Sequence, residues 1–152
     1  MGRVDMLQAV KIQARVLVPI VKALELELGK EKAHAIVGRA IAESWATFVA
    51  SRDPERDTHP SRDSGAFDFP VESEIVENTP ESLATNLTAC QFARYFRGIG
   101  EPEIGALLTC NVDFAVNAKL RPSWEFTRTQ TQMQGAAFCD FRWRLRSRGP
   151  KR

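Results

Sequence analysis

The chain is poor in the residues that most often mark a metal centre or a disulfide framework. Its 152 residues include only three cysteines and two histidines. An odd number of widely spaced cysteines does not form the pattern of a small disulfide-linked scaffold. Zinc bound by the three thiols and an aspartate would need short Cys–Cys loops, and neither CxxC nor HExxH occurs. We therefore expect reduced thiols in a cytoplasmic protein, with no metal and no cofactor.

Long apolar runs, glycine-rich phosphate loops and a strong charge imbalance are also missing. No apolar run approaches the roughly 20 residues that a membrane-spanning helix needs. The first residues lack the compact apolar core of a signal peptide, so we expect none. The formal net charge of +2 is too small to indicate a nucleic-acid partner. We expect neither a membrane nor a nucleic acid among the partners.

The composition that is present fits one folded domain. With 43% hydrophobic and 26% charged residues, the chain can bury a core and expose a polar surface. Its character changes along the chain, which predicts a helical hairpin (1–50), a surface loop (51–69), a sheet with inserted helices (70–146) and a basic tail (147–152). We expect the tail to be solvated, a phosphate-binding arm being the alternative. A homo-oligomer is compatible with this composition.

Helical periodicity dominates the first third of the sequence. Apolar residues between Asp5 and Leu28 fall close to one stripe, which predicts a helix. Pro19 removes a backbone donor, so we expect a kink or a short break near residues 17–18. Gly29 ends this helix, and residues 31–50 form a second one that returns antiparallel to it. The polar segment that follows is expected to be a connector, a lid over a site being the alternative.

Strand patterns appear in the second half of the chain. Val71–Asn78 and Leu83–Cys90 are joined by a proline turn, which predicts a hairpin. Helices are expected at 91–98 and at 101–120. Trp124, Phe126 and Arg128 then alternate with polar residues as in a half-buried strand, Gly135 marks a tight turn, and a last strand carries Cys139, Phe141, Trp143 and Leu145 on one face. The expected fold is α+β, with helices packed on a four-stranded antiparallel sheet.

Several side chains in these elements could carry chemistry. A buried Arg128 requires a carboxylate, either its own or a ligand's, although a solvated arginine at a strand end is the simpler interpretation. Cys110 and Asp113 lie one helical turn apart, which places a thiol beside a carboxylate. The alternative is that both cysteines, Cys110 and Cys139, pack as small apolar residues and that Asp113 is solvated or caps a turn.

The order of these residues resembles the L-2-amino-thiazoline-4-carboxylic acid hydrolase family. The resemblance covers roughly residues 83–145 and rests on the following elements in order: Cys90 opening a short helix, Pro102, Cys110 with Asp113, the run Arg128, Thr129 and Thr131, then Gly135 and the ending Cys139–Arg142. The chain departs from the family pattern at Gln132, where a leucine is usual, and at Ala136, where an aspartate is usual. The N-terminal helix pair agrees with the family in type.

This resemblance implies a small hydrolase that opens a heterocyclic ring at a non-peptide C–N or C–S bond. The type substrate is a 2-aminothiazoline carboxylate or a similar cyclic amide or amidine. Cys110, Asp113 and Cys139 are the implied catalytic residues, and Asp113 is preferred over Asp140, which alternation along the strand turns away from Cys139. The implied substrate-binding residues are Arg128, Thr129, Thr131, Asn111 and Cys90. The alternatives are a non-catalytic ligand-binding or sensor domain and a purely structural subunit.

Overall fold

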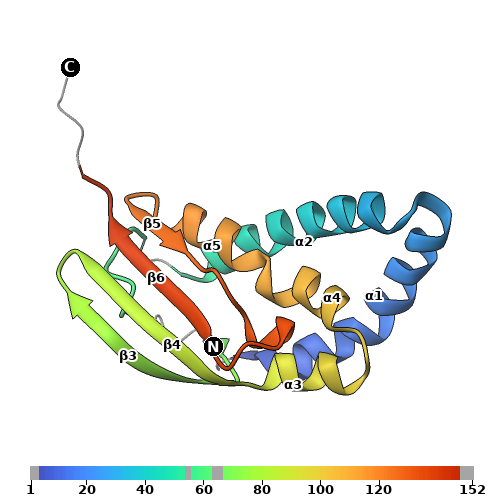
Figure 1. Ribbon diagram of the computed structural model, residues 1–152. Helices are drawn as coiled ribbons and strands as arrows, with labels where there is room; N and C mark the ends of the chain where they lie inside the picture. Colours follow the sequence, from blue (N-terminus) through green and yellow to red (C-terminus); the bar gives the residue numbers. More distant parts are fainter. Residues whose placement is uncertain (1–3, 54–55, 63–66, 148–152) are drawn as a thin grey trace.

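The computed structural model describes residues 4–53, 56–62 and 67–147, and its described elements form a helical layer and an antiparallel sheet (Figure 1). The helices are α1 (Met6–Leu28), α2 (Lys30–Arg52), α3 (Gln91–Gly98), α4 (Pro102–Gly105) and α5 (Val112–Leu120). The sheet has the order β3-β4-β6-β5, from β3 (Val71–Thr79), β4 (Ser82–Cys90), β5 (Trp124–Thr127) and β6 (Cys139–Leu145). Each neighbouring pair is antiparallel, so the predicted α+β class is confirmed.

The N-terminal hairpin has nearly the predicted bounds. Asp5 caps α1 by accepting a hydrogen bond from the backbone N–H of Gln8 at 3.0 Å. Gly29, with a φ of 82°, separates α1 from α2, which returns toward the sheet so that the two helices form a V (Figure 1). Of the kink or short break predicted near residues 17–18, the break is absent, because α1 is continuous through Pro19. Ala14 and Val21 are buried on either side of it and hold both halves of the helix against one core.

The segment predicted as a loop contains more structure than its composition indicates. Its first two residues, Ser51 and Arg52, complete α2. The two-residue strand β2 (Phe67–Asp68) pairs in parallel with β1 (Val4–Asp5), which sequence analysis missed because two residues show no periodicity. Residues 54–55 and 63–66 of the predicted loop lie outside the described residues, as do 148–152 of the predicted basic tail.

The described part of this segment is tied to the start of β5. The Asp57 carboxylate accepts hydrogen bonds from the backbone N–H and the hydroxyl of Ser123. The His59 ring bonds the Thr79 carbonyl at 2.8 Å and meets the Trp124 ring edge-on at 5.1 Å. These contacts join the loop to the sheet.

The predicted fourth helix is divided into three parts. After α4 comes a π-helical turn (Ala106–Cys110), in which the Asn111 N–H reaches back to the Ala106 carbonyl at 2.8 Å. The Thr109 hydroxyl also donates to the Gly105 carbonyl at 2.8 Å. A π turn adds a residue to the helix and changes which side chains share a face, and such turns are frequent at functional sites. Apolar periodicity alone does not reveal it.

The C-terminal strands pair as predicted, but the connection between them is longer than a tight turn. Thr127 pairs with Arg142, and residues 128–138 then leave the ladder before β6 begins at Cys139. This connection contains the 3-10 turn η2 (Gln132–Gln134). Gly135 has the predicted positive φ, 101°, but it ends η2 rather than a two-stranded hairpin turn. Side-chain hydrogen bonds hold this segment in place, and the periodicity of a strand does not predict such bonds.

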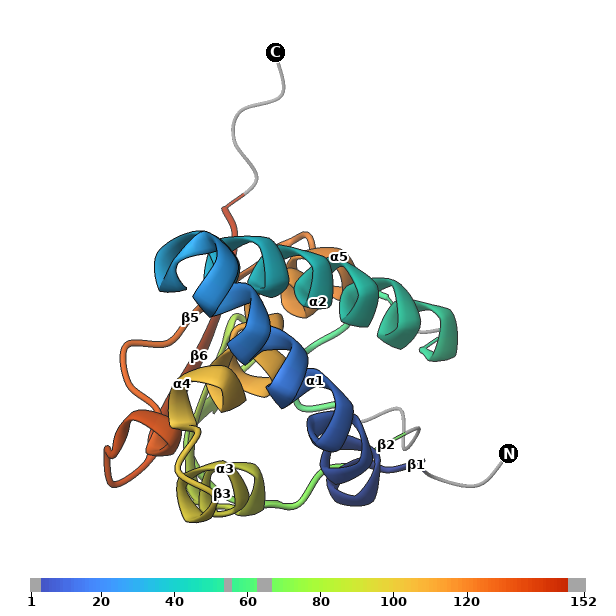
Figure 2. The same ribbon diagram turned by 90° about the vertical axis from the view of Figure 1, so that its right-hand side faces the viewer.

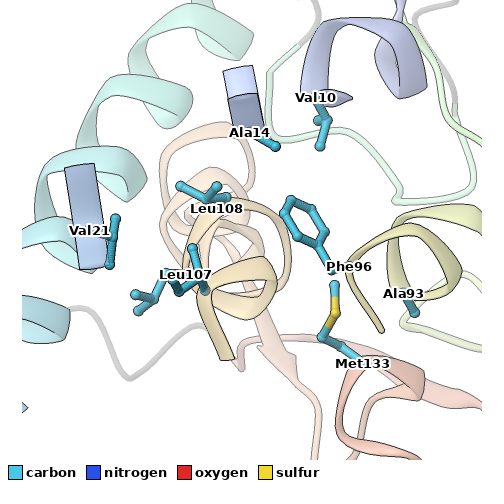
Figure 3. Packing of buried hydrophobic residues seen from close by; sticks show 9 residues of the cluster. Val10, Ala14, Val21, Ala93, Phe96, Leu107, Leu108 and Met133 are labelled. Carbon is cyan, nitrogen blue, oxygen red and sulfur yellow. The ribbon is translucent and has the colours of Figure 1, made fainter. Parts of the chain in front are cut away.

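Phe96 lies at the centre of the main hydrophobic core (Figure 3). This α3 side chain is fully buried among residues from α1, from the π turn and from η2. The surrounding buried residues are Val10, Ala14, Val21, Ala93, Ile104, Leu107, Leu108 and Met133. The core therefore brings α1, near the start of the chain, together with η2, in its C-terminal part. Among the described residues, no helix is both long enough and apolar enough to cross a membrane.

Gly105 packs against Phe96 so closely that a side chain at this position is not accommodated. A Cβ at Gly105 would lie 2.5 Å from the Phe96 ring, whereas a Cβ at Gly98 would meet no atom within 4 Å. We expect Gly105→Ala to lower the free energy of unfolding by about 1–3 kcal/mol through overpacking. Gly98→Ala is the matched control and should change it by about 1 kcal/mol or less. Chemical denaturation of both variants tests this, and equal stabilities would contradict it.

Candidate functional site

Three thiols that are far apart in the sequence lie in one region of the fold. Cys90 ends β4, Cys110 ends the π turn and Cys139 begins β6. Cys90 acts electrostatically on both other thiols, and the charge of Asp113 acts on all three. All three cysteines are free. The helix layer and the sheet thus bring the three cysteines and Asp113 into one region.

An ion pair between Arg128 and Asp113 lies at the centre of this region. The Arg128 Nη1 donates to Asp113 Oδ2 at 2.5 Å and to the Cys110 carbonyl at 2.9 Å. The guanidinium also stacks on Phe114 and Phe141, with centroid distances of 5.1 and 5.6 Å. The Arg128 side chain is 6% exposed and that of Asp113 is 29% exposed. The buried arginine therefore has a carboxylate of its own chain, and part of the Asp113 side chain remains exposed.

Local structure explains why these two side chains meet. Asp113 occupies the first turn of α5, where the positive end of the helix dipole favours a carboxylate. Arg128 follows β5 directly and continues the face of Phe126, whose ring packs on Phe114 at 5.3 Å. Phe126 also contacts Phe141 and Trp143 of β6. Packing of α5 on the sheet thus places the Asp113 carboxylate beside Arg128.

The environment of Asp113 suits proton transfer near neutral pH. Burial raises the pKa of its carboxyl group to about 7, against the opposing charge and hydrogen bond of Arg128. A carboxyl group with a pKa near 7 exists in both protonation states at neutral pH. It can therefore accept a proton in one step and return it in another.

The thiols differ from Asp113 in that their environment keeps them neutral. Burial raises the pKa of Cys110 to about 12, although the Thr109 hydroxyl acts in the opposite direction. Burial also raises the pKa of Cys90 and of Cys139. Since the thiolate is the nucleophilic form, this environment disfavours nucleophilic attack by the thiols.

Asp140 supports the segment that carries Arg128. Its carboxylate accepts hydrogen bonds from the backbone N–H groups of Thr129 and Gln130, each at 2.9 Å, and from the Thr129 hydroxyl. Burial acts against ionisation, but these hydrogen bonds outweigh it and lower the pKa of Asp140. Thr131 has a similar role, because its hydroxyl accepts from the Gln134 N–H at 3.1 Å and caps η2. Both predicted substrate-binding threonines therefore make bonds within the protein.

Gln132 is a residue of this segment that sequence analysis noted only as a departure from a pattern. Its backbone N–H donates to the Cys139 Sγ at 3.2 Å, and its side-chain amide donates to the carbonyls of Thr88 and Ala137. The amide oxygen is buried and has no hydrogen-bond partner among the described residues. Gln132 thus links the connection between β5 and β6 to the end of β4, beside one of the three thiols.

An open pocket of about 690 Å³ adjoins the other side of the π turn. Of the predicted site residues only Asn111 lines it, together with His34, Arg97, Gly100, Pro102, Glu103, Ala106, Leu107, Met133 and Gln134. His34 bonds the Glu25 carboxylate at 2.5 Å, and Arg97 donates to the Gln132 carbonyl at 3.1 Å. Sequence analysis did not find this pocket, because its residues come from separate elements and share no motif. Within the described parts of the chain, no three His, Cys, Asp or Glu side chains are grouped as metal ligands.

The fold and the site define an α+β protein with an arginine–carboxylate pair between its helices and its sheet and three neutral thiols in the same region. The family model of L-2-amino-thiazoline-4-carboxylic acid hydrolase matches residues 9–143, and the chain belongs to this family. The match includes the helical hairpin as well as the C-terminal half, which contains the residues on which the resemblance rests. A search of curated proteins gives no match. The family name is that of a hydrolase.

Replacing Arg128 tests whether its charge opposes the effect of burial on Asp113. We expect Arg128→Gln to raise the pKa of Asp113 above about 7, because the cation that favours the carboxylate is lost. Carboxyl NMR signals of labelled aspartates, followed against pH, measure this shift. Arg142→Gln is the matched control, because Arg142 bonds Thr85 and Asn86 rather than an acid. An unchanged Asp113 titration in Arg128→Gln would show that the ion pair does not control it.

Proposed function

We propose that this chain hydrolyses a non-peptide C–N or C–S bond in a small heterocycle, with Asp113 as its acid–base group. The type substrate is a 2-aminothiazoline carboxylate or a similar cyclic amide or amidine. The observation that carries the proposal is the Asp113 carboxyl group, which has a pKa of about 7 and is bonded to Arg128 in a chain of this family. The free thiols fit a cytoplasmic location, which belongs to the same proposal.

In this mechanism water, rather than a thiol, attacks the ring. The Asp113 carboxylate takes a proton from the water molecule while the oxygen of that water bonds to the electrophilic amidine carbon of the ring. The carbon–heteroatom bond of the ring then breaks, and Asp113 returns the proton to the leaving nitrogen or sulfur. The net change is the addition of one water molecule, so no oxidant, reductant or cofactor is needed. The neutral thiols of Cys110 and Cys139 border the reacting groups and limit the entry of bulk water.

Arg128 positions the acid and supplies positive charge for a substrate carboxylate. Its Nη1 fixes the Asp113 carboxylate, and the two phenylalanine rings hold the guanidinium plane. In the proposal Thr129, Thr131 and Cys90 form the wall of the substrate site. Asn111, which is exposed and lines the open pocket, marks the side from which the ring enters.

A non-catalytic ligand-binding domain is the second candidate. It is favoured by the neutral thiols and by the bonds that Thr129 and Thr131 make within the protein. In such a domain the same residues would bind a heterocycle without changing it. The two candidates differ in whether Asp113 transfers a proton, so experiments on Asp113 distinguish them.

The first test is turnover of a panel of cyclic amides, amidines and thiazoline carboxylates, followed by mass spectrometry for a gain of water. We expect Asp113→Asn to lower kcat/KM by about 10²–10⁴-fold, because the amide cannot accept a proton. Asp57→Asn is the matched control. Asp57 bonds Ser123 at the start of β5 and has a φ of 59°, which asparagine tolerates. This control should retain the parent activity.

The pH dependence of the same reaction gives an independent check. Because the basic form of Asp113 is needed, kcat/KM should rise with pH and level off above an inflection near pH 7. A substrate that binds with equal affinity to the parent and to Asp113→Asn, and is turned over by neither, would support the binding domain instead.

Alkylation tests the assignment of the thiols. Because burial raises the pKa of all three cysteines, we expect iodoacetamide at pH 7 to modify each one more slowly than free cysteine. Mass spectrometry of peptides from timed reactions measures each rate. The same experiment on urea-unfolded protein is the control and should remove the protection. Faster modification of Cys110 or Cys139 than of free cysteine would identify a thiolate nucleophile and overturn the water mechanism.

A further inference from the structure

The outer face of α1 is apolar although it faces solvent. Ile12, Val16, Ile20 and Leu26 are 65%, 59%, 49% and 89% exposed. The opposite side of the same helix carries the buried residues of the core, so α1 is apolar on two sides. A surface helix normally presents a polar face to water. A contiguous exposed stripe of this kind is characteristic of an interaction surface.

The spacing of the stripe is that of a helix-to-helix seam. From Ile12 the exposed residues follow at Val16, Pro19, Ala23 and Leu26, in alternating steps of four and three. This is the repeat with which one helix packs along another. Figure 2 shows α1 crossing the front of the molecule with no described element over it. The seam is therefore accessible along its length.

Charge along α1 reverses from one end to the other. Lys11 and Arg15 lie in the first half, and Glu27 lies in the second, where Glu25 is already bonded to His34. The remaining charge of the second half, Lys22, is neutralised by a salt bridge to Glu101. An anionic lipid surface would require a basic flank along the whole helix. A second copy in the opposite direction instead places each basic half beside an acidic half, and opposed helix dipoles add to this preference.

We propose that α1 is the contact of a homodimer in which two α1 helices pack antiparallel about a two-fold axis near Pro19. Ile12 and Leu26 are each seven residues from Pro19, so Ile12 packs against Leu26 of the partner subunit. The small Pro19 and Ala23 side chains at the centre let the two helices approach closely. The seam is about 21 Å long at 1.5 Å per residue. Such a contact is at the small end of specific interfaces, so we expect a weak dimer.

Sedimentation equilibrium over a range of micromolar concentrations tests the dimer. The parent should associate, and Leu26→Glu should raise the dissociation constant about tenfold or more, because it places a carboxylate in the seam. Val76→Glu is the matched control, since Val76 is an apolar residue of β3 that is also exposed. It should leave the dissociation constant unchanged. A parent that stays monomeric overturns the proposal, as does equal weakening by both variants.

Cross-linking tests the direction of the helices. An equimolar mixture of Ile12→Cys and Leu26→Cys should form a disulfide-linked dimer between the two variants on mild oxidation, whereas neither variant alone should do so. Parallel helices would instead link Ile12→Cys to itself, which overturns the antiparallel arrangement. The parent, in which Cys139 is buried and Cys90 and Cys110 are partly buried, is the background control. Monomeric parent that binds vesicles containing phosphatidylglycerol would assign the stripe to lipid and overturn the dimer.

Discussion

The ion pair between Asp113 and Arg128 is the contact on which the arrangement of helices and sheet depends. Asp113 belongs to the helical layer and Arg128 to the end of a strand, so the pair fixes α5 on the sheet. Losing one partner of a buried pair costs about 3–5 kcal/mol, and less where solvent reaches it, as at Asp113. A cost of this size is a substantial part of the free energy of unfolding of a domain, which is roughly 5–15 kcal/mol. The packing that buries this pair also raises the pKa of Asp113, so stability and proposed chemistry depend on the same contact between α5 and the sheet.

The π turn and the β5–β6 connection place the other site residues around this pair. The π turn presents the Cys110 carbonyl to Arg128 and leaves Asn111 at the open pocket. The connection sends Met133 into the core and Gln132 beside Cys139. A segment with no regular ladder is thus held at both ends, by buried packing and by the Asp140 carboxylate. Proposed catalytic groups are positioned by this packing and not by a contiguous motif.

Much of the fold follows from local patterns. Apolar periodicity and Gly29 located the helical hairpin within two residues, the proline turn located β3 and β4, and alternation located β5 and β6. The prediction was wrong where local preference competes with tertiary contacts. Pro19 does not break α1, and the helix expected at 101–120 contains a π turn. Side-chain bonds from Asp113 and Asp140 replace the tight turn expected at Gly135, and such long-range bonds have no local signature.

By itself the sequence determined the fold class, the helix pair, the family and the set of candidate residues, because these depend on periodicity and on the order of residue types. Only the tertiary structure decided that Arg128 pairs with Asp113, that three distant thiols gather beside them, and that burial keeps those thiols neutral. The exposed apolar stripe of α1 likewise depends partly on the sequence and partly on the tertiary structure. Its apolar residues can be read from the sequence, but the burial of the opposite face decides which of them remain exposed.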